Sequence, residues 1–242
     1  MHNMLQEVRH LIYCPNVTGK PTLVENSELS KKINSLNAND IVFEIGTKDC
    51  KPRDKKQVIL IAGPNGTGKT RYVEQEGIHR KMDFLNADDI AVEIGAKDCK
   101  SAGRVWTKRI HDHLDAGISF AFESTIAGKT HPSILRMAGS MGYEIKFIYI
   151  FNRKVEDNLE RVKQRVEEHK GHNVPKEDII YRFGKSLEHF NETAELANIW
   201  EVFYTEAPSV YEPVAKSEYG NVLVQNPAIY DLFRQMTRGI LK

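Results

Sequence analysis

A glycine-rich segment with one lysine and one hydroxyl side chain is the strongest chemical signal in the sequence. It consists of Gly63, Pro64, Asn65, Gly66, Thr67, Gly68, Lys69 and Thr70. This order matches the Gly-x-x-x-x-Gly-Lys-Thr pattern of nucleotide-binding loops. Glycines let successive backbone N–H groups point at phosphate oxygens, and a helix that starts near Gly68 adds the positive end of its dipole. We therefore predict a phosphate-binding loop in which Lys69 contacts the outer phosphates and the Thr70 hydroxyl coordinates Mg²⁺.

Acidic and hydroxyl residues follow two further predicted strands. Asp88 and Asp89 follow one strand, and Glu123, Ser124 and Thr125 follow the other. The C-terminal ends of parallel strands line a ligand crevice, where a carboxylate such as Asp88 can accept the proton of an attacking hydroxyl. Alternatively, Asp88 or Asp89 caps the following helix, because aspartate favours that position. Glu123 could orient a substrate or a metal-bound water, or it could be a loop carboxylate without a partner.

A helix–loop–helix at about 154–190 is a candidate lid. Between 154 and 168 apolar residues recur on one narrow helical face, and Arg161 and Arg165 lie on a polar side. Pro175 suits the first turn of a second helix, which we expect to run to about Phe190. Arginines on a closing lid would stabilise charge on a transferred phosphoryl group. The alternative is a solvated helix face. His172, in the connecting loop, carries no specific signal by itself.

Strands alternate with helices around these residues. Apolar runs predict strands at 57–62, 82–86, 118–122, 144–151 and 198–204, and helical patterns fall at 68–77, 101–116 and 130–141. This alternation predicts an α/β fold, a parallel sheet with helices on both faces. After 205 we expect two short strands joined at 218–220 and a closing helix at 229–240.

Composition narrows the class of protein. The 242 residues are 40% hydrophobic and 28% charged, which permits a buried core, and the net charge of +1 gives no bulk attraction for nucleic acid. Cys14, Cys50 and Cys99 form no Cys-x-x-Cys pair, which is typical of a reducing compartment. There is no apolar run long enough for a membrane span or a signal peptide. We expect a cytoplasmic protein.

The first 56 residues contain a partial copy of the Asp88 region. Residues 36–51 and 85–100 are identical at 12 of 16 positions, and the first copy has no glycine-rich loop before it. One explanation for the repeat is a partial duplication that left a peripheral appendage. The alternative is that residues 36–51 imitate residues 85–100 and compete with them for their place in the site. We divide the chain into an appendage at 1–56, a core at 57–210 and a C-terminal hairpin and helix at 211–242.

Several segments together resemble the zeta-toxin family of P-loop kinases, including its bacterial branch labelled as predicted ABC-type ATPases. They are VILIAGPNGTGKT, FLNADDIA, SFAFESTIAGKT and NLERVKQRVEEHKGHNVPKEDIIYRF, in the family's order. The resemblance implies a P-loop nucleotide-kinase fold and ATP-dependent phosphorylation of a sugar hydroxyl. The family's characterised toxins act on UDP-N-acetylglucosamine and are held inactive by a partner antitoxin.

The resemblance also implies roles for single residues. Lys69 and Thr70 take the nucleotide and magnesium positions, and Asp88 takes the position of the catalytic base. Glu123 and Thr125 fall where the family binds the sugar nucleotide, with Asp89 beside the base as a further substrate candidate. Arg165 matches a lid arginine that contacts phosphates.

Two departures from the family concern positive charges. The toxins carry an arginine where this chain has Ala127, and Lys129 lies two residues further on. The second lid arginine of the toxins falls at about His172, and Arg182 is a positional substitute. Fewer cations would weaken or alter substrate binding.

Three functions remain open at this point. The first is a kinase with Asp88 as base, ATP and Mg²⁺ as cofactors and a small-molecule acceptor. The second is a nucleotide-dependent switch or interaction protein without an acceptor. The third is a nucleic-acid end kinase, which the neutral charge and the lack of an aromatic and basic stripe disfavour. ATP is expected because the guanine signature Asn-Lys-x-Asp is missing from the sequence. The appendage could act as a built-in restraint in place of an antitoxin.

Overall fold

The computed structural model describes residues 55–95, 99–168 and 174–238. The expected appendage up to residue 54, the first copy of the repeat and His172 lie outside the described residues. The described residues belong to one compact unit.

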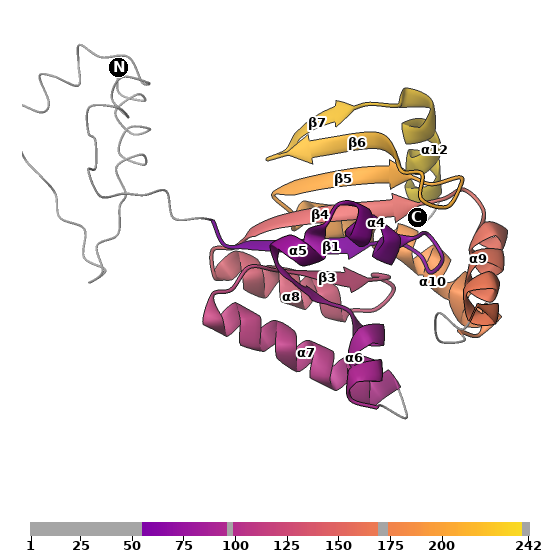
Figure 1. The fold of residues 1–242 in the computed structure, drawn as a ribbon. Helices are drawn as coiled ribbons and strands as arrows, with labels where there is room; N and C mark the ends of the chain where they lie inside the picture. Colours follow the sequence, from indigo (N-terminus) through magenta and orange to yellow (C-terminus); the bar gives the residue numbers. More distant parts are fainter. Residues whose placement is uncertain (1–54, 96–98, 169–173, 239–242) are drawn as a thin grey trace, which may run out of the picture. The chain divides into compact units, whose positions relative to one another are not determined.

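A seven-stranded sheet forms the centre of this unit (Figure 1). Its strands, in spatial order, are β2 (Asp83–Leu85), β3 (Phe120–Ser124), β1 (Gln57–Ala62), β4 (Glu144–Phe151), β5 (Ile199–Tyr204), β6 (Glu212–Glu218) and β7 (Asn221–Val224). The first five are parallel, whereas β6 and β7 extend the sheet in antiparallel fashion. The predicted parallel α/β fold is confirmed, and the expected C-terminal strands belong to the same sheet.

The alternating side chains of β1 explain why helices cover both faces. Val58 and Leu60 lie in one buried cluster, and Ile59 and Ile61 lie in another. On the first face pack α7 (Cys99–Ala116), α8 (Thr130–Ser140), α10 (Lys176–Glu188), α11 (Phe190–Glu195) and α12 (Pro227–Arg238). On the second face pack α4 (Lys69–Gln75) and α5 (Ile78–Lys81). A strand that is buried on both faces needs an uninterrupted apolar run, as β1 has.

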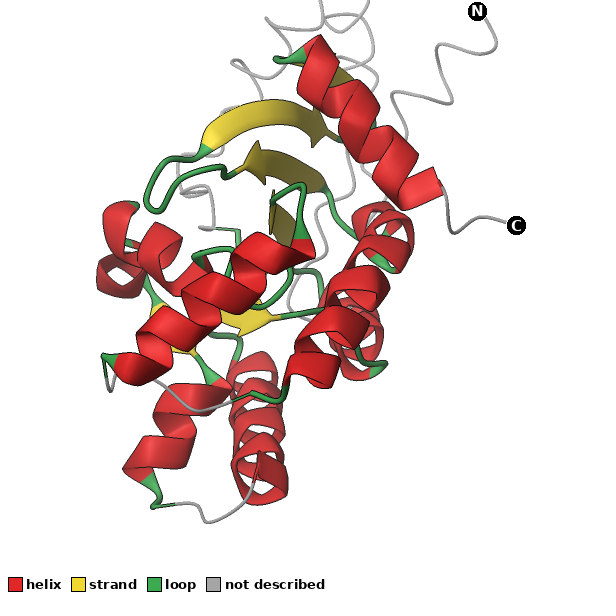
Figure 2. Ribbon diagram, turned by 90° about the vertical axis from the view of Figure 1, so that its right-hand side faces the viewer, coloured by secondary structure: helices red, strands yellow, loops and turns green. Residues whose placement is uncertain are grey.

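The chain reverses its direction of winding at β1. This strand pairs with β3 on one side and with β4 on the other. The connection after β1 runs past β3 to β2, whereas the connection after β4 runs the other way, to β5. Ligands bind at such switch points in open α/β sheets. The loop after β1 lies here, together with α6 (Ala87–Glu93) and the two helices of the candidate lid, α9 (Val155–Glu167) and α10; Figure 2 views the molecule from this side.

Some element boundaries differ from the prediction. Strand β3 begins at Phe120 instead of residue 118, because Ile118 is 47% exposed and precedes the buried stretch. The helix expected at 68–77 is α4, which ends at Gln75, and Gly77, with a left-handed φ of 62°, separates it from the short helix α5. The second lid helix ends at Glu188 and α11 begins at Phe190.

The β6–β7 hairpin turns at Tyr219 and Gly220, whose φ angles are both positive (49° and 86°). Such a two-residue turn matches the twist of antiparallel strands. Among the helices that the structure describes, none is long and apolar enough to cross a membrane.

Candidate functional site

The loop between β1 and α4 has the backbone geometry of a phosphate-binding loop. Gly63, Gly66 and Gly68 all have positive φ angles, of 143°, 81° and 85°. The buried Thr67 hydroxyl donates to the carbonyl of Pro64 over 3.0 Å, which closes the loop on itself. Helix α4 begins at Lys69, directly after Gly68, and Lys69 and Thr70 line a pocket beside the loop. The N–H groups at the start of a helix suit an anion there.

Neighbouring backbone holds this loop tightly on two sides. A Cβ atom on Gly63 would lie 2.0 Å from the carbonyl oxygen of Ile150 in β4. A Cβ atom on Gly66 would lie 2.8 Å from the carbonyl oxygen of Asn158 in α9. Only glycine fits at these two positions, and the first turns of the lid helix pack directly on the tip of the loop.

The Lys69 ammonium is buried inside the loop, with 5% of its side chain exposed. It donates to the carbonyl of Pro64 over 3.0 Å and lies 3.6 Å from a carboxylate oxygen of Glu123. Burial lowers the pKa of Lys69, the Glu123 carboxylate opposes that effect, and the nearby Arg165 adds to it. Two cations this close to the loop favour an anionic ligand.

Glu123, at the end of β3, connects the loop to the second strand. One carboxylate oxygen accepts hydrogen bonds from the Thr70 hydroxyl over 2.9 Å and from the Asn86 amide over 3.3 Å. With Lys69 beside the other oxygen, this carboxylate has three donors around it. The alternative of a loop carboxylate without a partner is therefore wrong.

Asn86 also sets the position of Asp88. The Asn86 side chain accepts the backbone N–H of Asp88 over 2.8 Å and caps α6. The alternative that Asp88 or Asp89 caps this helix is wrong, since the helix begins one residue earlier, at Ala87. Asp88 is left in the first turn with an exposed carboxylate that lines the pocket, where the helix dipole favours a negative charge.

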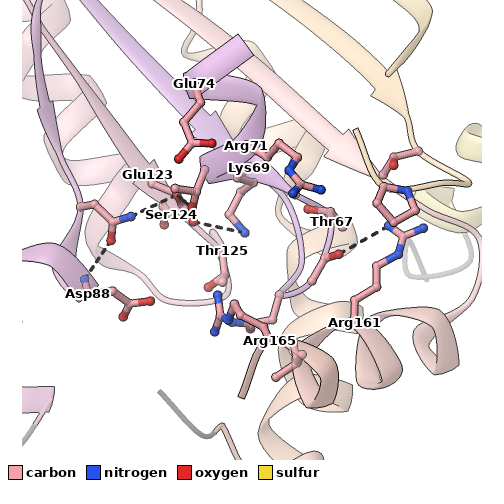
Figure 3. Close-up of a pocket in the computed structure, with 18 of the residues that line it drawn as sticks. Thr67, Lys69, Arg71, Glu74, Asp88, Glu123, Ser124, Thr125, Arg161 and Arg165 are labelled. Carbon is pink, nitrogen blue, oxygen red and sulfur yellow. Dashed lines mark hydrogen bonds and ion pairs between the residues drawn. The ribbon is translucent and has the colours of Figure 1, made fainter. Parts of the chain in front are cut away.

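A pocket of about 750 Å³ joins these residues to the lid. Figure 3 shows Asp88, Thr125 and Arg165 around the open space beside Lys69 and Glu123. The Nε atom of Arg165 is buried and has no hydrogen-bond partner within the described residues. Buried donors without partners are rare in proteins, so this atom marks a place where a ligand acceptor would fit.

Arg161 connects the lid to the segment after β5. One of its nitrogens donates to the Glu206 carbonyl over 2.6 Å, and another lies 3.5 Å from the Gly66 carbonyl. The Tyr211 hydroxyl donates to the Gly68 carbonyl over 2.7 Å. Arg161 is therefore not on a purely solvated face, and the segment from 205 to 211 supports the phosphate-binding loop.

The structure brings most of the predicted residues together. Arg182 lines the same pocket from α10 and lies 3.7 Å from Asp178. Asp89 and Lys129 are exposed and are not part of the pocket lining, because Asp89 follows Asp88 on α6 and Lys129 lies directly before α8. His172 is outside the described residues.

Sequence reasoning missed several contributors to the pocket and its support. Asn86 lies within the FLNADDIA segment, and its strong preference for helix caps could have identified it. Trp106, from α7, lines the pocket and donates to the Leu85 carbonyl over 3.1 Å. Tyr211 is 143 residues from its partner in the chain, and its surroundings in the sequence give no signal.

Comparison with known proteins agrees with this geometry. The model of the family described as zeta toxin matches residues 43–212. The chain belongs to the zeta toxin family. The resemblance seen in the sequence is thereby confirmed. A comparison with curated protein sequences finds no match.

Solved structures of other proteins share this fold. A chain of the AvrRxo1-ORF1:-ORF2 complex aligns with a TM-score of 0.59 at 17% identity, covering 76% of this chain and 64% of that one. The same complex has been solved with ATP, with the same scores. The PezAT toxin–antitoxin system of Streptococcus pneumoniae aligns with a TM-score of 0.52 at 14% identity, covering 90% of this chain and 91% of that one. This chain thus spans slightly under two thirds of the AvrRxo1 chain that it matches.

Proposed function

We propose that the protein is an ATP-dependent phosphotransferase that moves the γ-phosphate of ATP to a hydroxyl group of a small molecule. The observation that carries this proposal is the continuous chain of contacts from the phosphate-binding loop to Asp88. Thr70 and Asn86 both donate to Glu123, and Asn86 in turn holds the backbone of Asp88. A phosphate held at Lys69 would therefore lie in the same pocket as a carboxylate that can act as base.

The residues of the loop fit a nucleotide with Mg²⁺. Backbone N–H groups and Lys69 suit the phosphates, and the Thr70 hydroxyl is the ligand type that Mg²⁺ takes alongside waters. No cluster of three or more acidic, histidine or cysteine side chains that could hold a metal occurs among the described residues, which matches a metal held by phosphates and a single hydroxyl. When bound, Mg²⁺ neutralises charge on the phosphates. Glu123, which already accepts from Thr70, could accept a hydrogen bond from a water of the metal and so orient it.

Asp88 is our candidate for the general base. Its carboxylate lines the pocket opposite the lid and is open to a substrate hydroxyl. The hydroxyl would lose its proton to Asp88 as its oxygen attacks the phosphorus. Arg165 from the lid, with Arg161 and Arg182, would then stabilise negative charge on the transferred group.

The proposals for the acceptor and the partner rest on the resemblance to the family. We propose a UDP-amino-sugar such as UDP-N-acetylglucosamine as the first acceptor to test, with Glu123 and Thr125 beside it. We propose an antitoxin protein as partner, because AvrRxo1-ORF1 was solved with ORF2 and PezAT is a toxin–antitoxin system. We place this activity in the cytoplasm, where ATP and sugar nucleotides are both present.

The test is transfer of labelled γ-phosphate to cell metabolites, with sugar nucleotides first. Asp88→Asn should lower transfer at least about 100-fold, because it removes the base, while Mg·ATP affinity stays within about twofold of wild type. Asp89→Asn is the matched control, since Asp89 neighbours Asp88 on the same helix but does not line the pocket. Full transfer by the Asp88 variant would refute the assignment. ATP hydrolysis that no metabolite stimulates would favour a nucleotide-dependent switch.

A further inference from the structure

The end of β3 and the segment that joins it to α8 carry Glu123 and Thr125 and contain a strained residue. Ile126 has a φ angle of 48° and is fully buried. A β-branched residue in this left-handed region is a genuine outlier, and such strain persists only where the surroundings enforce it. We call residues 123–129 the acceptor loop, because Glu123 and Thr125 line the pocket on the side of Asp88.

Two hydrogen bonds hold this conformation. The Ile126 N–H donates to the Ser124 hydroxyl over 3.0 Å, within the loop itself. The Ile126 carbonyl lies 2.7 Å from Nδ1 of His189, which is 63 residues further along the chain. A carbonyl only accepts, so the proton must be on Nδ1 of His189.

His189 is itself fixed at the end of the lid. It joins α10 to α11, and its carbonyl accepts the hydroxyl of the buried Thr193 over 2.7 Å. The same hydroxyl lies 3.0 Å from Nε2 of His131, which belongs to α8 directly after the acceptor loop. Helix α10 is also anchored to the sheet, since Ser186 and Tyr149 hydrogen bond over 3.0 Å. The imidazole of His189 therefore links a fixed point of the lid to the middle of the acceptor loop.

We propose that His189 is a positioning residue for the acceptor: its Nδ1–H holds the Ile126 carbonyl and so keeps Glu123 and Thr125 turned into the pocket. This inference rests on the proposed function, because it assigns the acceptor half of the pocket to this loop. His189 is not among the residues that line the pocket, so its effect reaches the substrate through the loop. Since Arg182 lies in the middle of α10 and His189 directly follows its last residue, the same helix positions both a lid cation and the acceptor loop.

The proposal predicts different effects for His189→Leu and His189→Asn, whose side chains are of similar size. Asparagine can place an amide donor near the position of Nδ1, whereas leucine has no donor. His189→Leu should raise the KM for UDP-N-acetylglucosamine about tenfold, and His189→Asn should recover most of that loss. Calorimetric affinity for Mg·ATP should stay within about twofold of wild type in both, because the phosphate-binding loop is untouched. Thermal unfolding identifies a variant that fails to fold.

Nitrogen NMR of the imidazole gives a direct signature. The wild-type His189 signal should show the proton on Nδ1, and the amide signals of residues 124–128 should shift in His189→Leu and return in His189→Asn. A proton on Nε2 alone, or unchanged amide signals in the leucine variant, would overturn the proposal. So would equal KM values in both variants. If the wild type transfers phosphate to no acceptor, the proposed function fails, and the NMR measurements still decide the role of His189.

Discussion

Glu123→Gln tests the centre of the site because it removes a charge and keeps the shape of the side chain. The carboxylate has only acceptors, and it faces donors from Thr70, Asn86 and Lys69. An amide has one oxygen and one NH₂ group, so its NH₂ group must face one of these donors without forming a hydrogen bond. We expect the variant to lose both stability and part of its response to Mg²⁺.

The distances set the size of the loss in stability. At 3.6 Å and an effective dielectric constant of about 20, the Glu123 and Lys69 charges attract by roughly 5 kcal/mol. Glu123 keeps 18% of its side chain exposed, and the amide still accepts one hydrogen bond, so solvent screening and this bond reduce the net effect. We expect the nucleotide-free protein to lose about 2 kcal/mol in free energy of unfolding at pH 7.

Measurements with ATP should distinguish the effect of Glu123 on stability from its effect on the response to Mg²⁺. Bound phosphates give Lys69 new anionic partners, so ATP without metal should bind the variant at least as well as it binds wild type. The gain in affinity that Mg²⁺ brings should fall about tenfold, as happens when outer-shell ligands of metals are removed.

Urea unfolding and calorimetry with ATP, in the presence of Mg²⁺ or EDTA, measure both quantities. Glu74→Gln is the matched control, since Glu74 lines the same pocket from α4. A Glu123 variant with unchanged stability and an unchanged gain from Mg²⁺ would falsify this account of the carboxylate.

Three further outcomes follow from the packing around the site. Gly63→Ala should abolish Mg·ATP binding in calorimetry and lower stability by about 3 kcal/mol, because its Cβ atom would lie 2.0 Å from the Ile150 carbonyl; normal binding would contradict the close approach. Tyr211→Phe should weaken Mg·ATP binding a few-fold through loss of its bond to the Gly68 carbonyl, and an unchanged dissociation constant would show that this bond does not support the loop. Burial lowers the pKa of His131 to about 4 from an ordinary value of about 6.5, so the unfolded chain binds one more proton between these values and stability falls as pH drops through them. Urea titrations at pH 7 and pH 5 should differ by about 2 kcal/mol more in wild type than in His131→Asn, and equal differences would exclude this histidine as the cause.

The phosphate-binding loop and its flanking elements could be predicted because their signals are local. The apolar run of β1, the glycine spacing and the following helix are all contained in residues 57–75. The runs of β1, β3 and β4 were also visible, because strands that are largely buried on both faces require apolar residues through most of their length. The start of β3 could not be predicted, since Ile118 is as apolar as Phe120 and only the tertiary structure leaves it exposed.

The remaining parts of the site depend on contacts between distant segments. Asp88 and Asn86 are both good capping residues, and the end of β2 decides that Asn86 is the one that caps. Lys129 was a candidate because it lies two residues after Ala127, where the family carries an arginine, but its place directly before α8 leaves it outside the pocket lining. The partners of Gly68 and Ile126 lie 143 and 63 residues away, and neither Tyr211 nor His189 is part of a recognisable motif.

The contact between Gly66 and the backbone of Asn158 determines where a fluorescent label on α9 would detect movement. Because the first turn of α9 packs against the loop, α9 cannot rotate as a rigid body about its first residue. Any opening movement must therefore hinge at a later point along the helix. A dye attached at Glu156 would thus keep a constant separation from a second dye on α4, whereas one at Glu167 would register the approach of ligand. The first turn of α9 thus provides a position of constant distance, and its last turn provides the position whose distance changes.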